Sequence, residues 1–303
     1  MDLKRIKLYK KDELPPIIYH YTSQHGLLEI IKSKCFWATD IHYLNDFSEY
    51  DYSYNIVRRL LINLEVVFLM QTGSSGDNIE IGANTQIDHP ERKALDKTVE
   101  VFESFTTSTS YLCSFSEEGD LLSQWRGYCP NGNGFSIGFD TEKLMKIMNK
   151  YNYNIVQCIY EVQDQERIVK QLIDELFSTL KKIGYEKEDK IFDEIIEFYL
   201  AFHLIAPRLK DKSFKEEKEW RFCFSFIVKP AEKKILYREG KSFIIPYDSV
   251  PIADSNNEIP IDRIIISPTP HKELSHNSLL EFLRQHKLNN IKIIDSEIPF
   301  RNW

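Results

Sequence analysis

The chain has no cysteine pairs, no excess of basic residues and no long apolar run. Its five cysteines show no CxxC spacing and no short Cys/His spacing: Cys35, Cys113, Cys129, Cys158 and Cys223. A zinc site or a disulfide framework is therefore not expected, and we predict no bound metal. Lys and Arg number 39 against 46 Asp and Glu, for a formal charge of −7. Without surplus cations to neutralise phosphates, the chain does not resemble a general nucleic-acid binder.

Membrane and export signals are also missing. The most apolar window, residues 60–70, is interrupted by Asn63 and Glu65, and it is far shorter than the roughly 20 residues that span a bilayer. The first 16 residues are charged and lack the apolar core of a signal peptide. We therefore expect a cytoplasmic protein with reduced thiols and no membrane partner.

Hydrophobic periodicity predicts one α+β domain over residues 1–303. Alternating runs typical of strands lie near 17–22, 35–39, 111–116, 135–140, 156–162 and 220–226, with shorter ones near 234–237, 242–246, 263–267 and 292–295. Ser23 is placed to cap a helix that runs to Lys34. Apolar residues at helical spacing predict helical insertions over about 50–105 and 164–210, and the polar stretch 71–90 reads as a flexible surface loop. No repeat or linker divides the chain.

Aromatic residues are unusually abundant and make up 13% of the chain. Most follow strand or helix periodicity and are expected in the core. A smaller set lies beside polar residues at predicted strand ends, where a sheet can direct side chains into a site. We predict that five rings of this set line a pocket: Tyr21, Trp37, Trp125, Tyr128 and Trp220.

His20 and Glu219 are the candidate catalytic residues. Thr22 follows His20 on the same strand face, so the two could grip a ribose, although a lone strand histidine is more often a hydrogen-bonded core residue. Glu219 shares a strand face with Arg221 at the start of an apolar run, where a carboxylate could stabilise a cation. The alternative for this acidic and basic run is a solvated edge with weak ion pairs.

Candidate binding residues follow from the same clusters. Ser114 and Ser116 alternate in one strand and should face one side, as hydrogen-bond donors to a nucleotide. A serine hydrolase is disfavoured because no GxSxG elbow surrounds them. Trp125 and Tyr128 lie three residues apart on a helical turn, and they could equally roof a core. The full set of predicted binding residues is Tyr21, Thr22, Trp37, Asn45, Ser114, Ser116, Trp125, Tyr128 and Arg221.

These motifs, in this order, resemble a widespread and largely uncharacterised bacterial domain family that is often found beside phage-defence genes. The resemblance rests on Tyr19 to Ser23, Trp37 to Thr39 with Asn45-Asp46, Cys113 to Ser116, Trp125 to Tyr128, Gly134 to Asp140 and Glu217 to Arg221. The closing segments 264–268 and 298–301 also look like its C-terminal strands. The similarity runs from about Ile17 to the end of the chain.

That family in turn resembles ADP-ribosyltransferase-like folds, which have a split β-sheet around NAD. The resemblance implies NAD as a substrate, His20 on the nicotinamide ribose, Glu219 on its 2′-hydroxyl, and stacking by Tyr21, Trp37 or Tyr128. Cleavage of the nicotinamide–ribose bond passes through a cationic state that a carboxylate stabilises. The leading hypothesis is thus an NAD-consuming toxin or phage-defence effector, which either modifies a protein or nucleic acid or hydrolyses NAD. The alternative is a non-catalytic nucleotide-sensing or interaction module, and a nuclease is disfavoured because the acidic residues lack metal-type spacing.

Overall fold

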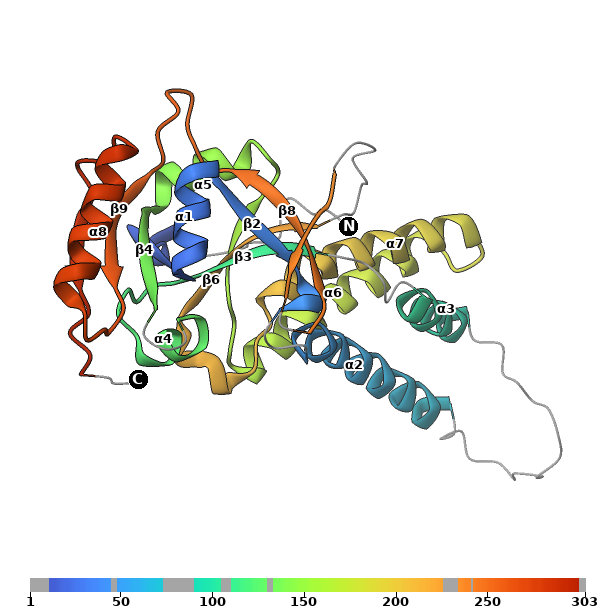
Figure 1. Cartoon of the computed structure of the whole chain (residues 1–303). Coiled ribbons are helices and arrows are strands. Elements are labelled where there is room, and N and C mark those ends of the chain that lie inside the picture. The colour runs from blue at the N-terminus through green and yellow to red at the C-terminus, as the bar shows by residue number, and fades with distance from the viewer. Residues whose placement is uncertain are drawn as a thin grey trace.

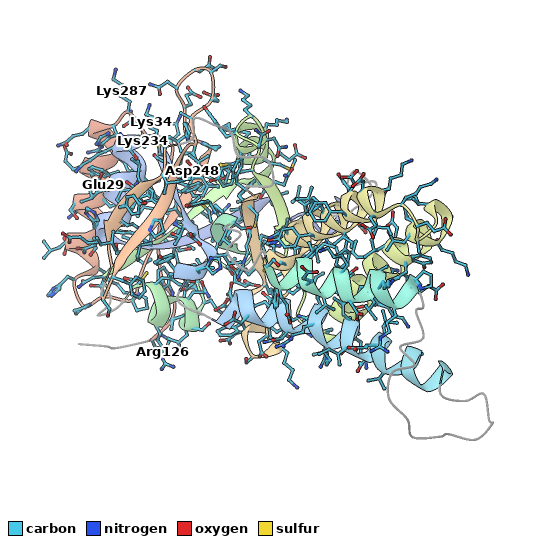
Figure 2. All side chains as sticks on the ribbon, turned by 90° about the vertical axis from the view of Figure 1, so that its right-hand side faces the viewer. Glu29, Lys34, Arg126, Lys234, Asp248 and Lys287 are labelled. Atoms are coloured by element: carbon cyan, nitrogen blue, oxygen red, sulfur yellow. The ribbon has the colours of Figure 1, made fainter. Side chains whose placement is uncertain are left out.

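A sheet and a group of helices make up the molecule. The computed structural model describes residues 11–44, 48–72, 90–104, 110–129, 133–225, 234–240 and 242–299. In Figure 1 the strands occupy one side, with helices α1, α5 and α8 beside them, while α2, α3, α6 and α7 extend away on the other side. Figure 2 is turned by 90° from Figure 1. In it, Lys287 lies at the top and Arg126 at the bottom of the part of the molecule that contains the sheet.

The described residues form a mixed, open ten-stranded sheet with the order β10-β9-β4-β1-β3-β2-β8-β7, and β6 pairs with both β3 and β5. The only parallel pair among these strands is β9 with β10. The strands are β1 (Ile17–Ser23), β2 (Cys35–Asp40), β3 (Ser110–Ser116), β4 (Gly134–Asp140), β5 (Asn154–Gln157), β6 (Glu219–Ser225), β7 (Leu236–Glu239), β8 (Ile244–Pro251), β9 (Ile261–Ile266) and β10 (Lys292–Asp295). The predicted α+β class with a mixed sheet is confirmed.

Strand β3 is the centre of the sheet and the point where it splits. One edge of β3 pairs with β6 along its whole length. The other edge pairs with β1 only at Tyr19↔Ser116, and with β2 at Thr39↔Leu112 and Asp40↔Tyr111. Because a strand has only two edges, β1 and β2 must share this one and diverge from each other along β3.

The main apolar core lies on one face of the sheet. Helices α1 (Gln24–Ser33), α5 (Thr141–Asn149) and α8 (Lys272–Gln285) cover this face, which we call the core face. Phe36, Phe115 and Phe222 project into this core from three different strands. As predicted, Ser23 caps α1, its hydroxyl accepting a hydrogen bond of 3.1 Å from the backbone N–H of Gly26.

The two predicted helical stretches pack together around a second apolar cluster. Helices α2 (Ser48–Thr72) and α3 (Pro90–Ser104) come from the first stretch, and α6 (Val162–Ile183) and α7 (Glu188–Ile205) from the second. Gly184 ends α6 at a φ of 87°, a conformation that favours glycine. No helix of the described residues is both long and apolar enough to cross a membrane.

Short helical turns connect these parts. They are η2 (Lys11–Glu13), η3 (Ile41–Tyr43), η5 (Ala206–Arg208) and η6 (Lys212–Glu217), and a short helix α4 (Leu122–Tyr128) packs on the sheet opposite the core face. The predicted strand 156–162 is wrong beyond Gln157. There the chain leaves the sheet and pairs with the segment after α7, Ile159 N–H donating to Arg208 O at 2.6 Å. The predicted loop 71–90 lies largely outside the described residues.

Candidate functional site

Strand β6 divides its side chains between the two faces of the sheet. Trp220 and Phe222 enter the main core, so Glu219 and Arg221 must project from the opposite face. On the neighbouring strand β3, Ser116 pairs with Glu219 and Ser114 with Arg221, so that both serines share this second face. The predicted alternation of these four residues is confirmed.

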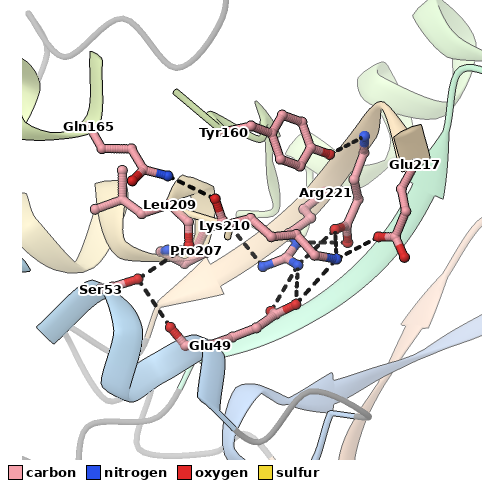
Figure 3. A network of polar contacts seen from close by, with 10 residues as sticks. Glu49, Ser53, Tyr160, Gln165, Pro207, Leu209, Lys210, Glu217 and Arg221 are labelled. Atoms are coloured by element: carbon pink, nitrogen blue, oxygen red, sulfur yellow. Dashed lines mark hydrogen bonds and ion pairs between the residues drawn. The ribbon is translucent and has the colours of Figure 1, made fainter. Parts of the chain in front are cut away.

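Glu219 lies at the centre of a buried ionic network. Figure 3 shows the other members of the network, Glu49, Lys210, Glu217 and Arg221, converging from different parts of the chain. Its Oε1 accepts from Arg221 Nε at 2.7 Å, and its Oε2 accepts from Arg221 Nη2 at 2.8 Å and from Lys210 Nζ at 2.6 Å. Glu217 Oε2 also accepts from Lys210 Nζ at 2.6 Å. Glu49 contacts both cations, Arg221 Nη2 at 2.8 Å and Lys210 Nζ at 3.3 Å. Three carboxylates therefore surround two cations.

The network joins parts of the chain that are distant in sequence. Glu49 belongs to the first turn of α2, Lys210 follows η5 at the end of the helical part, and Glu217 closes η6. The side chains of Glu49, Lys210 and Glu219 are each 5% exposed, and that of Arg221 is 1% exposed. The cluster is thus a closed junction between the helices and the sheet.

Neighbouring polar groups complete this junction. Arg221 Nη1 donates to Pro207 O at 2.9 Å, and the Tyr160 hydroxyl accepts from the backbone N–H of Glu219 at 2.8 Å. Ser53 Oγ donates to Ala206 O at 2.8 Å, and Gln165 Nε2 donates to Lys210 O at 2.8 Å. Buried polar groups are normally satisfied in this way, and the surrounding bonds hold the charged side chains in place.

The charges determine the ionisation of the network. Burial opposes ionisation of Glu219, but Arg221 and Lys210 outweigh it and lower the pKa of Glu219 to about 2. Burial has the larger effect on Glu217 and raises its pKa in spite of Lys210. The pKa of Lys210 is raised, because the carboxylates of Glu219 and Glu49 overcome its desolvation. Glu219 is therefore a firmly ionised carboxylate whose lone pairs are engaged by cations.

His20 does not lie with Glu219. On β1 it pairs with Ile137, whose side chain is in the main core, and its ring is 5.3 Å from that of Phe36 and 5.4 Å from that of Phe115. His20 thus faces the core side of the sheet, opposite Glu219. The prediction that these two side chains grip one ribose is wrong for this fold, because the sheet separates them.

The environment of His20 explains its role in the fold. Its Nδ1 lies 2.9 Å from Ser114 O, on the edge of β3 where β1 and β2 diverge. Burial lowers the pKa of His20, so the imidazole is kept neutral. Thr22 is on the same face as His20, as its pairing with Phe135 shows. This arrangement matches the alternative of a hydrogen-bonded core histidine.

Several of the predicted pocket rings are buried. Tyr21 packs edge-on against Trp125 at 4.8 Å, and its hydroxyl donates to Glu118 O at 2.8 Å. The indole N–H of Trp125 donates to Asp120 at 2.6 Å, and that of Trp220 donates to Glu117 at 2.7 Å. Trp125 is 1% exposed and Trp220 is fully buried, so neither can line an open pocket in this structure.

The other predicted binding residues also differ in how far they are buried. Tyr128 is half-buried near the network, and burial followed by the Glu219 charge raises its pKa. Ser116 is buried and donates to Glu217 O at 2.7 Å. Trp37 is half-buried at a distance from this cluster, over β8. Asn45 lies outside the described residues.

Sequence reasoning missed Glu49 and Lys210. Neither has a local signal, because each contacts the motif at Glu217 to Arg221 only through the tertiary fold; Glu49 and Arg221 are 172 positions apart. Among the described residues no group of three or more His, Cys, Asp or Glu is placed to hold a metal ion. The five cysteines are all free thiols.

Comparison with known proteins links part of this junction to a family. Residues 124–222 match the model of a protein family of unknown function, DUF2971. The matched segment contains Trp125, Tyr128 and the whole motif from Glu217 to Arg221, and so includes the centre of the ionic network. Searches of curated proteins and of solved structures returned no match.

Proposed function

We propose that this protein is a non-catalytic nucleotide-sensing module, in which the network around Glu219 fixes the helices on the sheet. The main support for a non-catalytic function comes from the contacts and burial of Glu219. Both of its oxygens accept hydrogen bonds from cations, and the side chain is 5% exposed. A carboxylate that stabilises a forming sugar cation must reach the sugar, and this one is already neutralised by Arg221 and Lys210.

Binding of a nucleotide is supported by the polar and aromatic residues that remain accessible. Trp37 and Tyr128 are half-buried rings, of the kind on which a base can stack. A sensor that responds to a nucleotide in a phage-defence system would agree with the family resemblance of the sequence motifs.

An NAD-consuming enzyme of the ADP-ribosyltransferase type is the second candidate. It is favoured by the divergence of β1 and β2 along β3, a split sheet such as that fold has, and by the presence of Tyr128, Ser114 and Glu219 on one side of the sheet. In this case a protein or nucleic acid would receive the ADP-ribose. Catalysis would require Glu219 to exchange its bonds to Lys210 and Arg221 for contacts with the substrate.

Release of nicotinamide separates the two functions. The purified protein is incubated with NAD, with and without cell extract, and free nicotinamide is measured for the wild type and for Glu219→Gln. The sensing function predicts no release by the wild type, together with measurable binding of a nucleotide by calorimetry. Sustained release by the wild type would overturn the non-catalytic function. Its loss in Glu219→Gln, under conditions in which circular dichroism shows the variant to be folded, would assign Glu219 as the catalytic carboxylate. Glu216→Gln serves as the matched control, because Glu216 is exposed on η6.

A further inference from the structure

Arg238 is a half-buried cation with few partners. It lies on β7 opposite Ile245 of β8, and its side chain reaches across β8, where Nη2 donates to Thr39 Oγ1 of β2 at 3.3 Å. Its Nε is buried and has no hydrogen-bond partner. Among the described residues no carboxylate forms an ion pair with it, in contrast to Arg221, which contacts both Glu49 and Glu219.

Burying a guanidinium group lowers the stability of a protein unless an anionic group pairs with it. A charge taken out of water loses hydration that only a counter-ion or several hydrogen bonds can replace. Burial lowers the pKa of Arg238, and the nearby Tyr247 only partly opposes this. Arginine presents a planar fork of donors that matches a phosphate or a carboxylate. The chemistry of this position is therefore that of an anion site.

Aromatic rings lie beside the cation on the same face of the sheet. Thr39 is opposite Tyr247 in the β2–β8 pair, and Trp37 is opposite Ser249, so these four side chains share one face. The rings of Trp37 and Tyr247 are 5.0 Å apart between centroids. His25, at the start of α1, closes the row with its ring 6.2 Å from that of Trp37.

The spacing along the strands suits a nucleotide. Arg238 reaches the level of Thr39, and Trp37 is two residues further along β2, a step of about 7 Å. A phosphate bound by Arg238 at this level would thus be one sugar unit away from a base on Trp37. Stacking on an aromatic ring and a charge-assisted bond to phosphate are the two general contacts of nucleotide recognition.

We propose that Arg238 and Trp37 bind the phosphate and the base of a nucleotide, while Thr39 and Tyr247, which are 8% and 9% exposed, hold these two side chains in place. This inference rests on the proposed sensing function and specifies its site. The site lies on β2, β7 and β8, and the ionic network around Glu219 contributes no residue to it.

Calorimetric titration of the intact protein tests the site with ATP, NAD, ADP-ribose and inorganic pyrophosphate. Arg238→Gln is expected to weaken nucleotide and pyrophosphate binding by about tenfold or more, because a charge-assisted bond to phosphate is lost. Trp37→Leu is expected to weaken nucleotide binding while leaving pyrophosphate binding within about twofold, since a ring stacks only on a base. Arg284→Gln on α8 is the matched control, with the same change of charge at an exposed position.

Stability measurements distinguish a ligand-binding arginine from a structural one. Because Arg238 has no counter-ion among the described residues, Arg238→Gln should melt at the same temperature as the wild type or above it when no ligand is present. A large fall in the melting temperature would overturn the proposal, since Arg238 would then support the fold.

The binding data also separate the site from the function. Nucleotide binding that survives unchanged in Arg238→Gln overturns the site and leaves the sensing function standing. If the wild type binds no nucleotide of the panel, the sensing function fails. In that case the pyrophosphate titration tests the site. If the wild type binds pyrophosphate and Arg238→Gln does not, the site stands as a phosphate site. If the wild type does not bind pyrophosphate, the proposed site is overturned.

Discussion

Replacing Glu219 by glutamine should lower the stability of the protein strongly. Glutamine has nearly the same shape, but its neutral side chain cannot accept all three charged donors that Glu219 now accepts from Arg221 and Lys210. Removing one partner of a buried ion pair typically costs about 3–5 kcal/mol. The lower end applies here, because Glu49 still contacts both cations.

The ionisation of Glu219 makes this contribution to stability depend on pH. Arg221 and Lys210 outweigh burial and lower its pKa from 4.5 to about 2. The folded pKa lies below the unfolded one, so this contribution is present above pH 4.5 and is lost as the pH falls toward 2.

Equilibrium unfolding in urea, followed by tryptophan fluorescence and circular dichroism, measures this loss. We expect about 3 kcal/mol at pH 7, or a fall of roughly 6 °C in the melting temperature for a chain of this size. Glu216→Gln is the matched control, because Glu216 is exposed on η6 and should change stability by less than about 0.5 kcal/mol. A loss below about 1 kcal/mol for Glu219→Gln would refute the argument that the network is a closed ionic junction.

Four further substitutions test the network at Glu217 and other parts of the fold. Glu217→Gln should leave the urea midpoint at pH 7 unchanged or higher, because burial raises the pKa of Glu217 and the folded state disfavours its charge; a loss like that of Glu219→Gln would contradict this. Burial lowers the pKa of His203 from 6.5 to about 4. As the pH is lowered, the unfolded chain therefore takes up the proton at a higher pH than the folded protein does, and the stability decreases between pH 6.5 and pH 4. His203→Gln should flatten this slope in a pH series of urea midpoints, and an unchanged slope would exclude His203 as its source. Gly134→Ala should lower the melting temperature by several degrees, because its Cβ would meet Thr22 O at 2.7 Å. At Gly127 a Cβ meets nothing within 4 Å, and in a helix Gly127→Ala should raise stability by up to about 1 kcal/mol.

The secondary structure could largely be predicted because its signals are local. The run from Ile17 to Thr22 alternates and forms β1, Ser23 accepts from the first turn of α1 as a capping residue does, and Gly184 ends α6. The one strand that failed in part, 156–162, leaves the sheet after Gln157 to pair with the chain after α7. That partner is about fifty residues away, beyond the reach of periodicity.

The candidate site could be predicted only in pieces. Alternation on β6 correctly places Glu219 beside Arg221 and opposite Trp220. It could not show that Glu49 and Lys210 would close around them, because those residues arrive from the two ends of the helical part. Arg238 also has no local signal, since its importance depends on which charges the fold leaves beside it.

The amino-acid sequence by itself determined which side chains of each strand share a face, where α1 begins, and which stretches of the chain are helical. The shared strand faces and the helical stretches follow from the periods of the backbone, two for a strand and 3.6 for a helix. Only the tertiary structure decided that His20 and Glu219 lie on opposite faces of one sheet, and that Glu219 meets Lys210. Strand order and register set these distances, and they depend on contacts between residues that are far apart in the chain.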